Sequence, residues 1–198
     1  DIKAGRGDLR IDTGDANAAG AAAMKAATMR DLARVMQTGS GRALIKGLVD
    51  NQSKNEDGKM VHHRTTIGDG GGFEAKTAPG AGGSANVAYN AGRPFEDPNA
   101  PTGAQAWRHL MRPDVVLYHE LVHAHHITHG TVAGGTVKDP AGAQDAKVDA
   151  AEYQAAGLGE YALAPFSENR PRAERAGVSA RGKSDDATPS AAAQAQHA

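Results

Sequence analysis

The chain has 198 residues, a mass of 20.4 kDa, a formal net charge of −1 and a pI near 6.8, which fits one domain and excludes a general electrostatic attraction for nucleic acid or anionic membranes. It contains no cysteine, so disulfides and thiolate metal sites are excluded, and any metal must be held by His, Asp or Glu. Aromatic residues make up 4% of the sequence and glycine occurs 25 times, so we expect a small aliphatic core with long loops.

Residues 15–50 predict two helices that act as packing elements. Asp15 or Asn17 can cap the first, which should end near residues 39–41. The apolar residues of this segment fall near one helical face: Met24, Ala27, Leu32, Val35 and Met36. A shorter helix should follow, with Leu44, Ile45 and Leu48 on one side. Methionine at this spacing is core filler more often than a metal ligand.

Residues 60–90 predict short strands separated by glycine-rich connections. Residues 60–67 favour one extended strand, on which His62 and His63 point to opposite faces and cannot both join one metal site. The glycines of residues 68–84 indicate a loop around a short strand, F-E-A-K. We expect residues 87–90 to form an open sheet edge, to which a peptide backbone could add as a further strand.

Residues 114–130 carry the strongest chemical signal. His119, Glu120 and His123 form H-E-x-x-H, which places two imidazoles one helical turn apart, about 40° from each other around the axis, beside a carboxylate. Asp114 can cap this helix, and Gly130 can end it in the left-handed conformation. Two histidines at this spacing hold zinc in hydrolases, where the carboxylate serves as a base. The pattern therefore predicts a zinc hydrolase site.

A catalytic zinc ion needs a third protein ligand, and several residues could supply it. His129 matches the last histidine of H-E-x-x-H-x-x-G-x-x-H, but His126 replaces the glycine that turns the chain toward the metal. His126 itself lies ~10 Å along the helix from His119, too far for three ligands at ~2.1 Å from one ion. Glu152 is a carboxylate candidate, and spacing alone does not choose it over Asp149.

The last third of the chain predicts one more helix and then a tail. Asp145 or Asp149 should start a helix that contains Val148, Tyr153 and Leu158. Residues 182–198 are rich in Ala, Ser and Gln without periodicity, which predicts disorder. We expect one domain over residues 1–181, with helices at 15–50 and the catalytic part at 60–181.

The sequence predicts no membrane-spanning segment. No apolar run approaches the ~20 residues of a membrane span, and the N-terminal residues lack the apolar centre of a signal peptide. Because residue 1 is Asp rather than Met, we expect the chain to be a processed piece of a longer protein.

Three stretches occur in an order and spacing that point to one family. They are H-E-L-V-H-A at 119–124, E-Y-Q-A-A-G-L at 152–158 followed by Tyr161, and S-E-N-R-P-R-A-E at 167–174. They resemble the NleD-type bacterial effector zinc metallopeptidases, found as type III secreted effectors and as toxin domains of Rhs-type proteins. The resemblance covers residues 86–181, while the first 60 residues match only loosely. It implies a compact α+β, zincin-like fold, with the motif helix packed on a small sheet and Glu152 as third metal ligand.

The resemblance also implies a zinc-dependent endopeptidase, secreted and delivered into a target cell, that cleaves a protein of that cell. We expect His119, His123 and Glu152 to hold Zn²⁺, and Glu120 to take the proton of the water that attacks the peptide carbonyl. Tyr161, with Arg172 as alternative, would stabilise the oxyanion. We expect a monomer that binds no nucleic acid and does not insert into membranes.

Two alternatives stay open at this stage. One is a metzincin-type peptidase in which His129 is the third ligand. The other is a non-catalytic binding module stabilised by a metal with four protein ligands. The sequence assigns no role to His125, His126 or, outside the metzincin alternative, His129, and it does not identify the substrate.

Overall fold

The computed structural model describes residues 7–14, 17–69, 74–77, 83–91, 95–96, 110–138, 147–162 and 164–176. Its helices are α1 (Ala18–Val35), α2 (Gly39–Val49), α3 (Pro113–His129), α4 (Ala150–Ala156), the short 3-10 helix η3 (Gly159–Tyr161) and α5 (Asn169–Arg175). Its strands are β1 (Leu9–Asp12), β2 (Gln52–Lys54), β3 (Met60–His62), β4 (Thr65–Gly68), β5 (Glu74–Thr77), β6 (Ala85–Ala88), β7 (Phe95–Glu96), β8 (Leu110–Met111), β9 (Thr136–Lys138) and β10 (Lys147–Asp149). Among the described helices, none is long and apolar enough to cross a membrane. The tail predicted at residues 182–198 lies outside the described residues.

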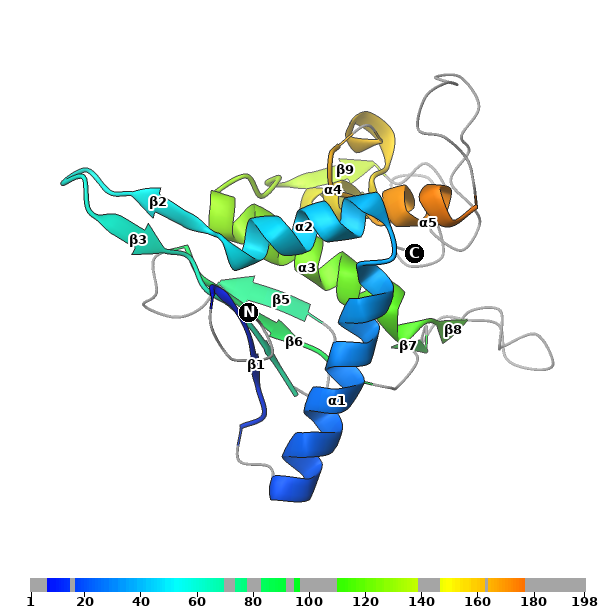
Figure 1. Ribbon diagram of the computed structural model, residues 1–198. Helices are drawn as coiled ribbons and strands as arrows, with labels where there is room; N and C mark the ends of the chain where they lie inside the picture. The colour runs from blue at the N-terminus through cyan, green and yellow to red at the C-terminus, as the bar shows by residue number, and fades with distance from the viewer. Residues whose placement is uncertain are drawn as a thin grey trace.

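A four-stranded sheet supports the helix that carries the H-E-x-x-H motif (Figure 1). Its strand order is β1-β4-β6-β5, with β1, β4 and β6 parallel and β5 antiparallel to β6. Alternate side chains point into the core, where Leu9, Ile67 and Val87 are almost fully buried. α3 packs against β5 and β6, and α1 and α2 pack against α3. This mixture of helices and small sheets is compatible with the α+β prediction.

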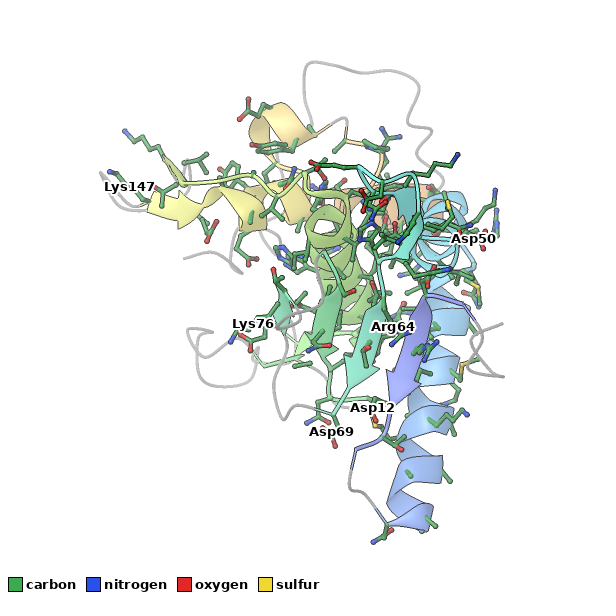
Figure 2. The ribbon with its side chains drawn as sticks, turned by 90° about the vertical axis from the view of Figure 1, so that its left-hand side faces the viewer. Asp12, Asp50, Arg64, Asp69, Lys76 and Lys147 are labelled. Carbon is green, nitrogen blue, oxygen red and sulfur yellow. The ribbon has the colours of Figure 1, made fainter. Side chains whose placement is uncertain are left out.

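The edge strand of this sheet is not the one predicted. β6, which contains Val87, pairs with β4 on one side and with β5 on the other. The prediction of an open edge at residues 87–90 is therefore wrong. Since β4 occupies one side of β6, the antiparallel strand β5 takes the other side and becomes the outer strand beside α3. Figure 2 shows Lys76 of β5 at one side of the sheet and Asp12 of β1 toward the other.

The first two helices form as predicted, but the turn between them comes earlier. Asn17 caps α1, which ends at Val35. Thr38 then caps α2, and its hydroxyl accepts a hydrogen bond from the backbone N–H of Gly41. A side chain at Gly41 would meet the Val35 carbonyl oxygen at 2.0 Å. The glycines that were expected to separate the helices therefore begin α2 and allow its close approach to α1.

The strand expected at residues 60–67 is divided into β3 and β4. β3 forms a hairpin with β2, whereas β4 joins the four-stranded sheet, so the chain changes direction between them. At this point His62 contacts the Asp8 carboxylate through Nδ1 at 3.0 Å, and His63 contacts the Ser53 hydroxyl through Nε2 at 2.7 Å. The two histidines thus face different polar partners.

α3 begins before its predicted cap. Arg112 occupies the N-cap position and Pro113 the first helical position, where a missing N–H has no cost. Asp114, predicted as the cap, lies instead in the first turn. It is fully buried, and its carboxylate pairs with Arg112 and Arg175. Gly130 ends the helix with φ 64° and ψ 29°, the left-handed conformation that was predicted.

α4 is shorter than the helix expected around it. Asp149 caps α4 by accepting a hydrogen bond from the backbone N–H two residues further on. Val148 belongs to β10, and Leu158 follows Gly157, at which α4 ends, so neither residue is helical as predicted. Asp145, the other candidate cap, lies outside the described residues.

Candidate metal centre

α3 presents the two histidines of the motif side by side. The side chains of His119 and His123 are only 10% and 12% exposed, and their Nε2 atoms lie 3.1 Å apart. The rings meet edge to face, with centroids 4.8 Å apart. The one-turn spacing in the helix causes this pairing. Two ring nitrogens at this distance require a shared proton or a cation between them.

Glu152 of α4 completes a group of three possible metal ligands. Its carboxylate oxygens lie 3.0 Å from His119 Nε2 and 3.2 Å from His123 Nε2. One ligand atom from each residue lies within 4.8 Å of the others, a geometry compatible with a metal ion. Asp149, the alternative carboxylate, is engaged as the cap of α4. α3 and α4 thus bring together the three residues that were predicted as metal ligands.

The side chain of Gln154 fixes the approach of α4 to the end of α3. Its carbonyl oxygen accepts a hydrogen bond from the N–H of Ala133 at 2.9 Å, and its amide nitrogen donates to the carbonyl oxygen of Thr131 at 2.9 Å. Gln154 is 8% exposed and stands two residues after Glu152. These two bonds attach the loop after α3 to α4, and they hold Glu152 opposite the histidines.

A further acidic residue contacts the opposite nitrogen of His119. Glu168 directly precedes α5 and is 1% exposed, and its carboxylate lies 3.0 Å from His119 Nδ1. Arg172, one turn along in α5, pairs with the other carboxylate oxygen. Sequence reasoning quoted both residues within S-E-N-R-P-R-A-E but assigned no role to Glu168. The feature of the sequence that could have indicated a role for Glu168 is an acidic residue four positions before an arginine, in the segment that follows the glycine at the end of α4.

Contacts with two carboxylates dominate the electrostatics of His119. Burial by itself would lower the pKa of His119, but hydrogen bonds to Glu152 and Glu168 outweigh it and raise this pKa to about 10. Burial opposes ionisation of Glu152, yet its hydrogen bonds to His119 and His123 hold its pKa well below the usual range. The carboxylates therefore stabilise positive charge at the place where a metal cation would bind.

Glu120, the predicted base, is 7% exposed and follows His119 directly in α3. Burial raises the pKa of its carboxyl group. The charges of His119 and His123 oppose this rise, and those of Glu152 and of Glu74 in β5 add to it. A carboxylate with raised proton affinity is suited to take up a proton and to return it.

Tyr161 and Arg172, the two candidates for oxyanion stabilisation, lie in different surroundings. Tyr161 is in η3, directly after α4, and its hydroxyl interacts with Glu160. Its ring packs against a small hydrophobic cluster, which consists of Val148, Tyr153, Ala156 and Leu158. Arg172 pairs with Glu168 on the Nδ1 side of His119, whereas Nε2 is the ring nitrogen that faces Glu152. These contacts do not test the oxyanion prediction for Tyr161.

The remaining histidines of α3 have contacts of their own. His125 stacks on His129 with ring centroids 3.9 Å apart, and it meets Phe166 at 4.6 Å. Burial, with a smaller effect of neighbouring histidines, lowers the pKa of His125 to about 3, so this residue packs as a neutral ring. Nδ1 of His126 lies 2.8 Å from the Thr131 hydroxyl. Nδ1 of His129 donates to the His125 carbonyl at 2.8 Å, within its own helix, which is not the turn toward the metal that a metzincin requires.

Comparison with known proteins identifies the family. No curated protein matches the chain. A family model, Peptidase_M91, described as "Effector protein", matches residues 12–181. This match extends well beyond residues 86–181, over which the sequence resemblance was recognised, and it includes the first two helices. Because the match covers more than half of the chain, the protein belongs to Peptidase_M91, the family of NleD-type effector metallopeptidases.

Proposed function

We propose that this protein is a zinc-dependent endopeptidase that acts as an effector on a protein of a target cell. The observation that carries the proposal is the convergence of His119 Nε2, His123 Nε2 and the Glu152 carboxylate, with the buried carboxyl group of Glu120 beside them. Membership of an effector peptidase family supports both the reaction and the delivery into another cell.

The donor set fits zinc. Two imidazole nitrogens and one carboxylate, without sulfur, are ligands that catalytic zinc uses in hydrolases. The Nε2 atoms of His119 and His123 lie 3.1 Å apart, and Glu152 faces them with both oxygens, Oε2 at 3.0 Å from His119 and Oε1 at 3.2 Å from His123. With one ligand atom taken from each residue, all three lie within 4.8 Å of one another, which is close enough to surround one ion. The side chain of Glu152 is 40% exposed, which supports access of water and substrate to the centre.

In this mechanism His119, His123 and Glu152 would hold the ion. When bound, zinc supplies Lewis-acid polarisation of the substrate carbonyl. Glu120 accepts the proton of the attacking water and then donates it to the leaving amine nitrogen as the peptide C–N bond breaks. The raised pKa of Glu120 favours this reversible protonation. We also propose Tyr161 as a donor to the oxyanion, because it lies in η3, the next helical turn after the helix that carries Glu152, and is partly exposed.

We propose that the substrate binds as an extended strand along β5. Among the described residues β5 has a hydrogen-bonded neighbour on one side only, and it packs beside α3. The charge of Glu74 in β5 acts on Glu120, which indicates that the strand lies near the proposed base. Backbone hydrogen bonds to such an edge bind many sequences, and side-chain contacts then select among them.

The test is a comparison of purified wild type with Glu120→Gln on a library of peptides derived from a cell proteome, with cleavage read by mass spectrometry. Glu56→Gln, an exposed carboxamide substitution in the turn between β2 and β3, is the matched control. We expect Glu120→Gln to retain zinc and to cleave about 10²–10⁴-fold more slowly, while the control cleaves normally. Cleavage by Glu120→Gln at the wild-type rate would contradict the assignment of the base, and zinc binding without cleavage would favour the binding module.

A further inference from the structure

The two ring nitrogens of His119 face different carboxylates. Nε2 lies 3.0 Å from Glu152, on the side of the proposed metal, and Nδ1 lies 3.0 Å from Glu168. Glu168 comes from the segment before α5, far along the chain from α3. Among the described residues the group of possible metal ligands consists of His119, His123 and Glu152, and Glu168 reaches this group through Nδ1 of His119.

The position of Glu168 is fixed by backbone and side chain together. Its N–H donates to the carbonyl oxygen of Ala155 in α4 at 2.8 Å. Its carboxylate, only 1% exposed, pairs with Arg172 through the oxygen that does not contact His119. A buried carboxylate costs free energy unless it is paired and hydrogen-bonded, and here both oxygens have partners.

We propose that Glu168 is a positioning residue for the metal ligand His119. This inference rests on the proposed zinc site. By accepting the Nδ1–H hydrogen bond, Glu168 fixes the tautomer in which Nε2 carries the free electron pair, and it fixes the ring plane toward Glu152 and His123. It also makes Nε2 more basic, because the negative charge opposite the ring favours positive charge on it. Glu168 does not touch the substrate.

Arg172 supports the position of the Glu168 carboxylate. Arg172 holds the Glu168 carboxylate from within α5, at the i and i+4 positions of the same segment. Its guanidinium thus orients the Glu168 carboxylate, which differs from the oxyanion role that sequence reasoning considered for it.

The experiment measures zinc affinity by chelator competition in wild type, Glu168→Gln and a control, Glu174→Gln. Glu174 lies on the same helix but bonds to the N–H groups of Gly39 and Ser40, away from the metal group. We expect Glu168→Gln to bind zinc about 10–100-fold more weakly, and the control to bind it as wild type does. Equal zinc affinity of Glu168→Gln and wild type would overturn the inference.

A second variant separates positioning from structural support. Glu168→Gln leaves the charge of Arg172 without its partner, so it can weaken binding simply by destabilising α5. The double variant Glu168→Gln/Arg172→Gln removes both charges. If Glu168 positions His119, the double variant regains folding stability but keeps the weakened zinc affinity. Recovery of wild-type zinc affinity in the double variant would show that the pair serves only to stabilise α5.

A measurement on the zinc-loaded wild type keeps the inference testable even if these variants fail to fold. Nitrogen-15 NMR of the histidine rings should show His119 bound through Nε2, with an Nδ1 proton that is strongly deshielded and slow to exchange. Coordination through Nδ1, or fast exchange of that proton, would overturn the inference. Failure of the proposed function is distinct, because in that case wild type itself would bind no zinc or would cleave nothing when zinc is bound.

Discussion

Replacing Gly157 with alanine should destabilise the protein far more than the same change at Gly130, although both glycines end helices in the left-handed conformation. The φ angle is 75° at Gly157 and 64° at Gly130. Alanine in this conformation costs about 1–2 kcal/mol at either site. A β-carbon added at Gly130 would meet nothing within 4 Å, whereas one at Gly157 would lie 2.4 Å from both Cβ and Oγ of Ser167.

The contact with Ser167 cannot be relieved by rotating a side chain, because a β-carbon moves only with its backbone. Ser167 is fully buried. Displacing this segment would also strain the neighbouring hydrogen bond, in which the N–H of Glu168 donates to the Ala155 carbonyl at 2.8 Å. Overpacking costs about 1–3 kcal/mol, and a weakened hydrogen bond adds about 1 kcal/mol. We therefore expect Gly157→Ala to cost about 3–6 kcal/mol, against about 1–2 kcal/mol for Gly130→Ala.

The assay is urea unfolding of the metal-free variants followed by circular dichroism. Ser167→Gly removes the atoms that the new methyl group would meet. In that background Gly157→Ala should cost only the free energy of placing alanine in the left-handed conformation, as Gly130→Ala does. Gly157→Ala should also weaken zinc binding, since it displaces Glu168. Equal destabilisation by Gly157→Ala and Gly130→Ala would refute the steric reasoning.

Other predictions follow from single contacts. Zinc binding near pH 7 should release about one proton, because His119 has a pKa of about 10 without metal. Calorimetry in buffers of different ionisation enthalpy measures the number of protons released, and the absence of proton release would contradict the prediction. Glu174→Gln should cost up to about 1 kcal/mol of stability at pH 7. Burial by itself would raise the pKa of Glu174, but hydrogen bonds from the start of α2 outweigh it and hold this pKa below its usual range. This contribution is present above the unfolded pKa of about 4.3 and is lost as pH falls through the folded value, so urea unfolding should show an undiminished difference at pH 7 and none at low pH. Gln154→Leu should cost about 1–3 kcal/mol and weaken zinc binding, because it leaves the backbone groups of Thr131 and Ala133 unpaired; unchanged zinc affinity would show that this contact does not position Glu152.

The part of the candidate metal centre that lies on α3 was predictable because its geometry is local. Helical spacing alone places His119 and His123 one turn apart, and the structure has their Nε2 atoms 3.1 Å from each other. Glu152 was different, since spacing could not separate it from Asp149 and the family resemblance selected it. In the structure, the choice depends on two local facts that the sequence pattern does not display: Asp149 caps α4, and Gln154 attaches α4 to the loop after α3.

The errors in the fold have a common physical cause, which is that strand partners and helix caps depend on distant parts of the chain. Residues 87–90 were expected to form an open edge, but β6 is enclosed because β4 and β5 both pair with it. Asp114 is a good cap by residue type, yet Arg175, from the other end of the domain, pairs with it inside the first turn of α3. Neither partner can be identified from residues near the predicted element.

Glu168 illustrates why the remainder of the site was not found. Its contact with His119 needs the left-handed Gly157 to end α4, the close passage of Ser167 along that glycine, and the hydrogen bond to Ala155. Each of these features is a local consequence of the stretches 152–158 and 167–174, which the family resemblance had already singled out. The second stretch is therefore physically part of the candidate metal centre, even though it contributes no proposed ligand. A substitution there that lowers activity should be examined for zinc affinity before it is attributed to misfolding, because the structure connects this segment to His119 through one buried carboxylate.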